Sequence, residues 1–450
     1  MSHSSSPPPR SRDASEVSFD FDERVLDNGL RVVLHEDRAA PIVAVHLMYH
    51  VGSKDERAGR RGFAHLFEHL LFQGSQHVAE SEHFKFIQNA GGTLNGSTWF
   101  DRTNYYETLP SSHLDLALWL ESDRMGFFAP GITQEKLDNQ RDVVKNERRQ
   151  AYENRPYGLA FETVLRMAYP EGHPYRHPTI GFMEDLDAAT LENVHEFFDS
   201  YYGPNNAVLV LAGDFDAKDA LRRIDRYFGE IPPRPRPASV EVPPPALDGG
   251  RRGTIEDQVH VPRVYLMYHA PSFNEPDFET SDLLSHLLSD GKSSRLHHEL
   301  IYDKRIAGEV HAFTWPTECA GMFFVVATAR PGVSAGSLEE AMLESIAGLR
   351  GDGLTEDEVE GARNRARRVL VQQLNGIGGR ADAFAHAAVL RGEPGYVNDA
   401  FARYREVSLK GCAGLASEIF DDTRLVALHV VPATEGEEAE GKEAEGEEAE

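Results

Sequence analysis

Two short stretches of the chain occur twice, in the same order and at almost the same separation. LMYH stands at 47–50 and again at 266–269, an offset of 219 residues (266 − 47). LFEHLLFQGS at 66–75 corresponds to LLSHLLSDGK at 283–292, an offset of 217 residues (283 − 66). Two ordered matches whose offsets differ by no more than a small loop variation predict a duplicated fold.

The residues between the two copies predict where one half ends and the next begins. The stretch Pro232–Gly250 reads PPRPRPASVEVPPPALDGG. Its prolines lack a backbone donor and hold the chain extended, so neither a helix nor a central strand can run through it. We therefore expect an N-terminal domain at 17–231 and a C-terminal domain at 251–433, joined by this Pro-rich linker. The low-complexity ends at 1–16 and 434–450 predict disorder, and the second of them is acidic.

Apolar strands and amphipathic helices follow each other in both halves without regular alternation. Each LMYH belongs to an apolar strand, and each LL segment belongs to a helix with apolar residues at helical spacing. The AVLVLA run at 207–212 predicts a central strand, the 98–109 region a further strand, and 156–167 a helix. This mixture favours an α+β fold, built as two homologous α/β-sandwich halves, over a doubly wound parallel sheet.

Composition excludes several classes of protein. Hydrophobic residues make up 40% of the 450 residues, which is enough for sizeable cores. The net charge is −27, of which nine Glu and one Lys at 435–450 supply −8. The remaining −19 argues against nucleic acid as the main partner. Cys319 and Cys412 are too few for a disulfide framework or a thiolate zinc cluster.

Hydropathy bears on localisation. No apolar run approaches the ~20 residues that a membrane span needs, so we expect no membrane partner. The start MSHSSSPPPRSR has no apolar core of the kind that defines a secretion signal. The chain is therefore expected to be cytoplasmic.

The segment GFAHLFEHLLFQGS contains the pattern H-x-x-E-H, formed by His65, Glu68 and His69. On a helix the two histidines lie ~40° apart, and Glu68 lies ~60° to the other side of His65. Two imidazoles on one face can bind one zinc ion, and the carboxylate beside them can accept a proton from an attacking water. The apolar residues around them indicate a buried helix, in which two hydrogen-bonded core histidines and a glutamate are the structural alternative.

A tetrahedral catalytic site needs a third protein ligand and leaves its fourth position to water. The segment QRDVVKNERRQAYENRPYG offers Glu147 on a predicted helix, with Glu153 and Asp142 as rivals. Taken alone, each of them is more often a solvated helix charge than a ligand. Spacing does not choose among the three.

The order of these motifs resembles peptidase family M16, the inverted-motif zinc peptidases that include pitrilysin, insulin-degrading enzyme and mitochondrial processing peptidase. The resemblance rests on H-x-x-E-H, on a Glu almost eighty residues later in VVKNERRQ, and on segments spread over most of the chain. These segments are GGTLNGSTWFDRTNYYETLP at 91–110, NRPYG, HPYRHPTIG at 173–181, YYGPNNAVLVLAGDFD at 201–216 and GKSSRLHHEL at 291–300. It implies two α+β halves that enclose a chamber, and a chain of this length resembles the short subfamily, in which a second subunit completes the clamshell.

The resemblance also implies a role for individual residues. His65, His69 and Glu147 correspond to the ligands of one Zn²⁺ per chain, and Glu68 corresponds to the general base for the attacking water. The 91–110 segment resembles the family's edge strand, which would pair with an extended peptide substrate. Asn95 matches the Asn that orients the substrate backbone there, although a turn residue between glycines is an equal alternative.

The chain departs from the family pattern in two places. Gln140 stands where the family has an outer-shell Glu, seven residues before the ligand Glu, which affects the tuning of the metal more than its binding. The family also holds the substrate with an Arg and a Tyr, seven residues apart, in the C-terminal half. Here Ile301 and Gly308 occupy those two positions.

The second half has also lost the metal-binding pattern. At the repeat-equivalent positions Asp282 replaces the first His and Ser285 replaces the Glu, although His286 remains. Arg365 stands opposite Glu147. One zinc site per chain is therefore expected.

Together these features predict a zinc endopeptidase that cleaves extended peptides inside a chamber. Because the Arg and Tyr are absent, we expect the catalytic subunit of a heterodimer whose M16 partner supplies both residues. The alternative is a non-catalytic core or assembly subunit of M16 type, comparable to the respiratory-complex subunits that resemble this family. Such subunits usually lose motif residues, whereas this chain retains all four.

Overall fold

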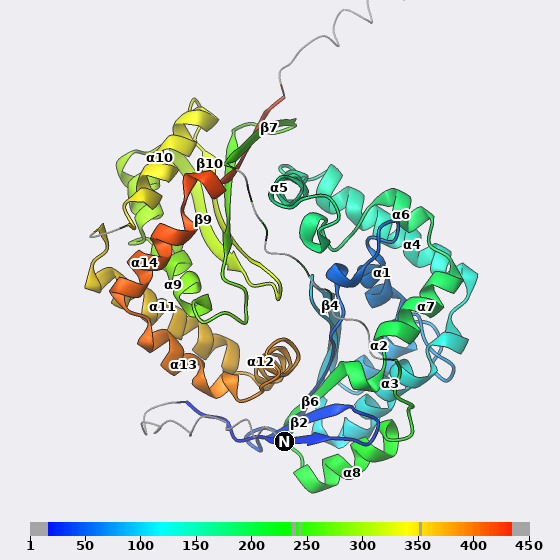
Figure 1. Cartoon of the computed structure of the whole chain (residues 1–450). Coiled ribbons are helices and arrows are strands. Elements are labelled where there is room, and N and C mark those ends of the chain that lie inside the picture. The colour runs from blue at the N-terminus through cyan, green and yellow to red at the C-terminus, as the bar shows by residue number, and fades with distance from the viewer. Residues whose placement is uncertain are drawn as a thin grey trace, which may run out of the picture.

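Two halves of similar construction face each other in the computed structural model (Figure 1). The structure describes residues 17–235, 240, 242, 245, 247, 249–350 and 353–433. The ends predicted to be disordered, 1–16 and 434–450, lie outside these residues. The described part of the 232–250 linker forms neither helix nor strand, as its prolines predict. No helix within the described ranges is both long and apolar enough to cross a membrane.

The N-terminal half is built on a six-stranded sheet in the order β1-β2-β6-β3-β5-β4. Strand β6 is buried along its whole length and lies between β2, to which it is parallel, and β3, to which it is antiparallel. The central strand predicted from the AVLVLA run is therefore confirmed. The strands are β1 (Asp22–Val25), β2 (Arg31–Glu36), β3 (Ile42–Tyr49), β4 (Thr93–Thr98), β5 (Thr103–Pro110) and β6 (Ala207–Gly213).

The C-terminal half repeats this sheet without its first strand. Its order is β7-β11-β8-β10-β9, which matches β2-β6-β3-β5-β4 position by position. The first pair is parallel and the others antiparallel in both sheets, so the predicted duplication is confirmed. The strands are β7 (Arg251–Asp257), β8 (Arg263–Ala270), β9 (Ala307–Trp315), β10 (Gly321–Ala329) and β11 (Val426–Pro432).

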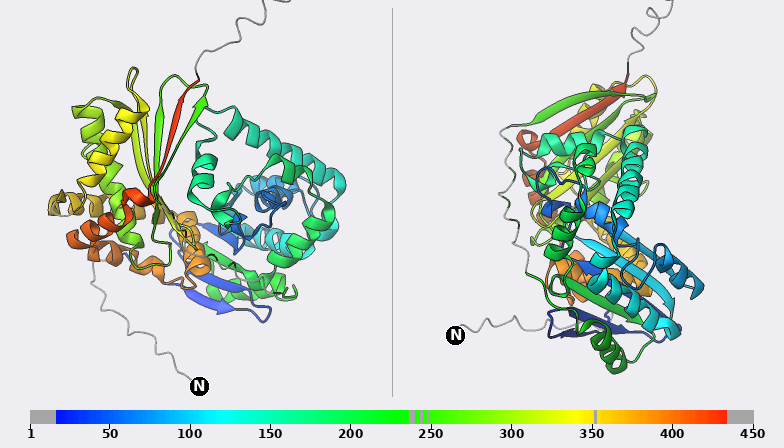
Figure 2. Two further views of the ribbon diagram at one scale, coloured as in Figure 1. Left: turned by 45° about the horizontal axis from the view of Figure 1, so that its top comes forward. Right: turned by 90° about the vertical axis from the view of Figure 1, so that its right-hand side faces the viewer.

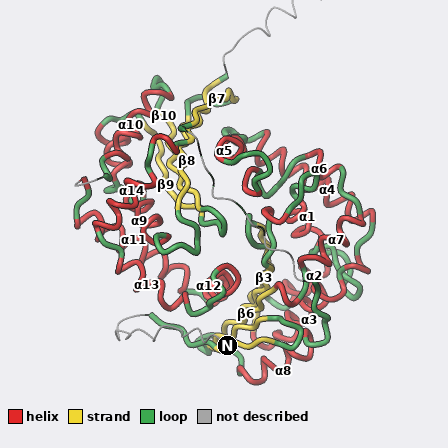
Figure 3. Tube along the Cα trace, viewed as in Figure 1, coloured by secondary structure: helices red, strands yellow, loops and turns green. Residues whose placement is uncertain are grey.

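Helices cover the outside of both sheets, which gives the predicted α+β layers (Figure 3). The first eight are α1 (Phe63–Leu70), α2 (Glu82–Asn89), α3 (Leu114–Phe127), α4 (Gln134–Arg148), α5 (Ala160–Ala168), α6 (Met183–Asp187), α7 (Leu191–Tyr201) and α8 (Ala217–Phe228). The C-terminal half adds α9 (Phe278–Ser289), α10 (Ala335–Ala347), α11 (Glu356–Leu374), α12 (Ile377–Leu390), α13 (Tyr396–Glu406) and α14 (Leu409–Ile419).

Two predicted elements differ in detail. The 98–109 region is not one strand, because residues 99–102 turn the chain from β4 into β5. Asp101 is the one residue of that turn whose type usually marks one, and no Gly, Pro or Asn accompanies it. The helix predicted at 156–167 begins only at Ala160, because Tyr157 has a left-handed backbone with φ +62° and cannot belong to it.

Each half lends one helix to the sheet of the other. Val164 and Leu165 of α5 pack in a buried cluster with Leu428 of the second sheet. Phe384 of α12 packs in another with Met48 of the first sheet. In both views of Figure 2 the orange helix α12 lies beside the blue strands of the N-terminal half. The two halves therefore share two apolar clusters in addition to the core that each has of its own.

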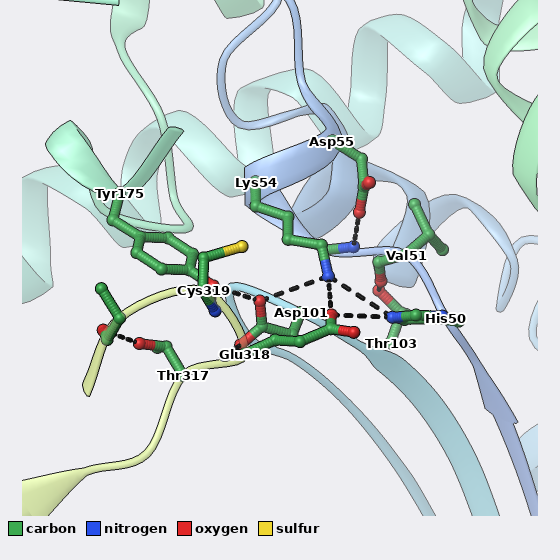
Figure 4. Close-up of polar contacts among 12 residues, drawn as sticks. His50, Val51, Lys54, Asp55, Asp101, Thr103, Tyr175, Thr317, Glu318 and Cys319 are labelled. Atoms are coloured by element: carbon green, nitrogen blue, oxygen red, sulfur yellow. Dashed lines mark hydrogen bonds and ion pairs between the residues drawn. The ribbon is translucent and has the colours of Figure 1, made fainter. Parts of the chain in front are cut away.

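A buried polar network, here called the clasp, also joins the halves (Figure 4). In it Lys54 pairs with Asp101 at 3.4 Å and with Glu318 of the C-terminal half. His50 Nε2 lies 2.9 Å from Glu318 Oε2, and the Tyr175 hydroxyl donates to Asp101 at 2.6 Å. Although burial acts to raise it, the hydrogen bond from His50 and the charge of Lys54 lower the pKa of Glu318 to about 2.

Removing the cation tests the clasp. The Lys54 side chain is 5% exposed, so Lys54→Met removes a counter-charge from the buried carboxylate of Asp101 and the part-buried carboxylate of Glu318, and should reduce the free energy of unfolding by ~3 kcal/mol. Because the pKa of Glu318 lies below its usual 4.5, its contribution is present above pH ~4.5 and is lost as the pH falls toward 2. The difference between wild type and variant should therefore shrink in acid.

Chemical denaturation at pH 7 and pH 3 measures both effects. Lys304→Met is the matched control, because Lys304 pairs with Glu344 on the surface and should contribute under ~1 kcal/mol. Equal losses in the two variants, or a difference that does not change with pH, would contradict a buried clasp.

Candidate metal centre

Two packed helices carry the four residues of the predicted site. His65, Glu68 and His69 lie on α1, and Glu147 lies one residue before the end of α4. Helix α1 packs against α4 in the N-terminal half (Figure 1). The i, i+4 spacing puts the two imidazoles on one face of α1, one turn apart.

The side chains of the two histidines and Glu147 converge. The Nε2 atom of His65 lies 3.7 Å from Oε2 of Glu147, and Nε2 of His69 lies 3.4 Å from the same oxygen. The potential ligand atoms of the three residues all lie within 4.8 Å of one another. Among the described residues no other three His, Cys, Asp or Glu side chains are placed to share a metal ion.

These separations suit a shared zinc ion better than direct hydrogen bonds. A hydrogen bond between an imidazolium and a carboxylate is ~2.7–2.9 Å long. Two ligand atoms that each lie ~2.0–2.1 Å from a tetrahedral zinc ion are ~3.4 Å apart. Two His and one Glu are also the ligands of one class of catalytic zinc site with an open fourth position. The residues present therefore fit a zinc ion.

The protonation states of these residues suit metal binding at neutral pH. Burial, with a smaller effect of the nearby His69, lowers the pKa of His65 to about 4, so its imidazole is neutral. The contact with the His69 imidazole, 3.4 Å away, lowers the pKa of Glu147, so its carboxylate is charged. Ligands must be deprotonated to bind a metal, and these two already are.

Glu68 has a different environment. Burial raises the pKa of its carboxyl, against the opposing effects of a hydrogen bond with Thr98 and the charge of His69. A carboxylate whose pKa moves toward neutrality is a better general base. A Cβ atom at Gly96 would lie only 3.2 Å from Cγ of Glu68, so glycine lets β4 approach this side chain closely.

A buried carboxylate fixes the start of α1. Glu56 accepts hydrogen bonds from the backbone N–H groups of Gly62 and Ala64, both at 2.8 Å. Amides at a helix start have no partner within the helix, so this carboxylate satisfies them. Gly62 has φ +94°, and a Cβ there would lie 2.6 Å from the carbonyl oxygen of Ile180. Glycine is therefore required where α1 begins against the 173–181 segment.

The 173–181 segment also holds α4. Arg148, the neighbour of Glu147, donates from Nη1 to the carbonyl oxygen of Gly181 at 2.8 Å. Its Nη2 forms a buried ion pair with Glu162 of α5, also at 2.8 Å. One segment thus contacts both helices and sets the distance between the histidines of α1 and the carboxylate of α4.

Of the three carboxylates considered from the sequence, only Glu147 reaches the imidazoles. Asp142 is exposed on α4 and lies outside the group. Glu153 lies beyond the end of α4, where it faces Arg148 at 3.9 Å. Asn95 is exposed on β4, and its side-chain oxygen accepts a hydrogen bond from the N–H of Gly96 at 3.0 Å.

Gln140 is buried on α4, two helical turns before Glu147 and on the same face. The Nδ1 atom of His65 is buried and has no hydrogen-bond partner among the described residues. A ligating His usually donates its second ring N–H to an acceptor, and none of the described residues supplies that acceptor here.

The positions of the missing Arg and Tyr lie in the C-terminal half. Ile301 packs against the core of that half in a π-helical turn (His297–Asp303), and Gly308 is exposed on β9. At the place equivalent to the metal group, His286 is held by Asp282 at 3.5 Å and Asp290 at 3.0 Å. The second half therefore offers one imidazole between two acids; its sequence indicated Asp282 and His286, and the structure adds Asp290.

Sequence reasoning missed three residues that position this group: Glu56, Arg148 and Gly96. A glycine inside a strand marks a close approach, which was the available signal for Gly96. Arg148 stood beside the candidate ligand, but adjacency does not indicate its partners. Glu56 carried no local signal, because only the fold brings it under α1.

Comparison with known proteins identifies the family of the chain. The family model "Insulinase (Peptidase family M16)" matches residues 31–180, and "Peptidase M16 inactive domain" matches residues 188–366. The zinc protease PqqE of Helicobacter pylori is 29% identical over 411 residues, covering 90% of this chain and 92% of its own. A probable mitochondrial-processing peptidase subunit beta of Schizosaccharomyces pombe is 22% identical over 422 residues, covering 91% of each chain.

A solved structure repeats the whole architecture. The crystal structure of a protease from Helicobacter pylori superposes with a TM-score of 0.85 at 27% identity, over 92% of this chain and 100% of that one. The fold of both halves and both family models therefore indicate the same family. This chain belongs to peptidase family M16.

Proposed function

We propose that the chain is a zinc-dependent endopeptidase that hydrolyses extended peptides between its two halves. The observation that carries the proposal is the convergence of His65, His69 and Glu147, with Nε2 to Oε2 separations of 3.7 and 3.4 Å. The similarity to chains named as zinc proteases supports it.

The residues of the site have separable tasks in this reaction. Zinc, when bound, would acidify a water and polarise the substrate carbonyl. Glu68 accepts the proton of the attacking water and can pass it to the leaving amine, for which a pKa raised by burial is suited. Its partner Thr98 and its close neighbour Gly96 hold it in place from β4.

The substrate would pair with β4. This strand is the last in its sheet, and within the described residues no strand pairs with its outer edge. An extended peptide can add to such an edge through main-chain hydrogen bonds. Asn95 is exposed on the same strand, next to Gly96, and would contact the peptide backbone.

Catalysis would need a second M16 subunit. The positions that hold the family's Arg and Tyr are Ile301 and Gly308, and neither side chain can donate a hydrogen bond to a substrate carbonyl. We infer a heterodimer whose partner supplies both residues. In the alternative, a non-catalytic assembly subunit, the retained motif would serve no purpose; the "inactive domain" model covers 188–366 and none of the four motif residues.

Zinc content tests the ligand set. The purified full chain should contain about one zinc per molecule, and His65→Ala and Glu147→Gln should lose it, because two ligands hold the ion too weakly. Elemental analysis by mass spectrometry measures the ratio. The matched control is Glu153→Gln, which neutralises the rival carboxylate and should keep the metal. Full zinc in Glu147→Gln would contradict the proposed centre.

Peptide cleavage tests the base and the missing pair. Glu68→Gln should keep its zinc and lose ~10²–10⁴-fold of the activity on unstructured peptides, because no group accepts the proton. The isolated wild-type chain should be weakly active, and the double variant Ile301→Arg, Gly308→Tyr should be more active.

The two cleavage results test different parts of the proposal. Undiminished cleavage by the Glu68→Gln variant would exclude Glu68 as the general base. Robust turnover by the isolated wild-type chain would rule out the need for a partner while leaving the peptidase assignment in place.

A further inference from the structure

A cavity of about 350 Å³ opens where the two halves meet. Residues 99–102, in the turn between β4 and β5, form one wall. Residues 313–317, at the end of β9 and in the following loop, form another, and His386 and Leu390 of α12 line a third side. The four residues of the metal centre do not line this cavity, so it is a separate feature of the interior.

Aromatic side chains from both halves line the cavity without filling it. Trp99 is 42% exposed and Phe313 is 36% exposed. The ring of Trp315 lies 5.1 Å from that of Trp99 and 6.1 Å from that of Phe313. Large apolar groups that stay exposed together in a cavity mark a binding surface, and such rings pack favourably against a further ring.

A buried cation lines the same cavity. Arg102 is 7% exposed, and its Nη1 donates to the carbonyl oxygen of Ser97 at 2.8 Å. Its Nε donates to Nε2 of His386 at 3.3 Å, which links the two halves, and its Cζ lies 5.7 Å from the centre of the Trp99 ring. A guanidinium attracts the face of an aromatic ring and repels a Lys or Arg side chain.

The cavity lies at the end of the strand proposed to bind substrate. Gly96 faces Glu68, and Trp99 follows it by three residues. At ~3.3 Å per residue this is ~10 Å along an extended chain. A peptide paired with β4 would therefore pass the cavity about three residues from the bond that lies beside Glu68.

We propose that this cavity is a specificity pocket, which takes an aromatic side chain of the peptide about three residues from the scissile bond. The inference rests on the proposed peptidase function and adds a substrate class to it. The clasp connects two walls of the pocket (Figure 4). Its Asp101 lines one wall and accepts a hydrogen bond at 3.0 Å from the N–H of Glu318, which follows the last residue of the other wall.

Peptide binding tests the pocket without catalysis. The zinc-loaded full chain carrying Glu68→Gln is titrated with a 15-residue Ser/Ala peptide that contains one central Phe, and with versions that have Ala or Lys there. Burial of the ring should make the Phe peptide bind ~10–100-fold more tightly than either version. Trp99→Ala and Phe313→Ala should each reduce this ratio to below ~3.

Phe127→Ala is the matched control, because Phe127 is also 42% exposed but lies at the end of α3, away from the cavity. It should leave the ratio unchanged. The two pocket variants come from different halves, so either one carries the test if the other fails to fold, as judged by its zinc content and unfolding midpoint. A ratio near one in the parent, or an unchanged ratio in a folded pocket variant, would overturn the proposal.

Cleavage gives a second readout. When the Phe is moved along the host peptide, the bond cut by the wild-type chain should move with it at a constant offset of about three residues. Cleavage that ignores the position of Phe would overturn the pocket and leave the peptidase in place. Preferred binding of Phe without any cleavage would support the pocket and leave the peptidase to be judged by the zinc content and by cleavage with a partner subunit.

Discussion

The site depends on how one loop holds two helices together. The 173–181 segment packs on the start of α1 at Gly62 and accepts a hydrogen bond from Arg148 near the end of α4. These contacts bring histidines from one helix within 4.8 Å of a carboxylate almost eighty residues later. Glu147 itself stays 45% exposed, so these contacts, and not burial, place it beside the imidazoles. The buried ion pair between Arg148 and Glu162 makes this geometry costly to disturb.

The C-terminal half repeats the fold of the N-terminal half but differs from it at the metal group. Both halves contain the same five-stranded arrangement, yet among the described residues only the first brings three potential metal ligands together. The exchange of α5 and α12 and the clasp join the halves, so that the second sheet faces the first at a fixed position. The second half has no such group among its described residues, so it can supply one side of the proposed peptide-binding surface. Its Phe313 lines the cavity on that side.

Much of this could be predicted from the sequence, for reasons that differ between elements. The AVLVLA strand and the H-x-x-E-H helix are local patterns, whose periodicity and apolar content suffice. Repeat matches indicated the duplication before any pairing was known. The turn at 99–102 was missed because its aromatic residues favour strands. The choice of Glu147 over its rivals, the exchanged helices and the support from Glu56 all depend on contacts between distant segments, which no local pattern encodes.

Anomalous X-ray diffraction at the zinc absorption edge, on crystals of the full chain, tests the central claim most directly. The account predicts one peak per chain, within coordination distance of the ring nitrogens of His65 and His69 and of the carboxylate of Glu147. A peak elsewhere, or an ion bound to the histidines with Glu147 turned away, would contradict it. So would crystals grown with zinc in which these three side chains pack together around no metal.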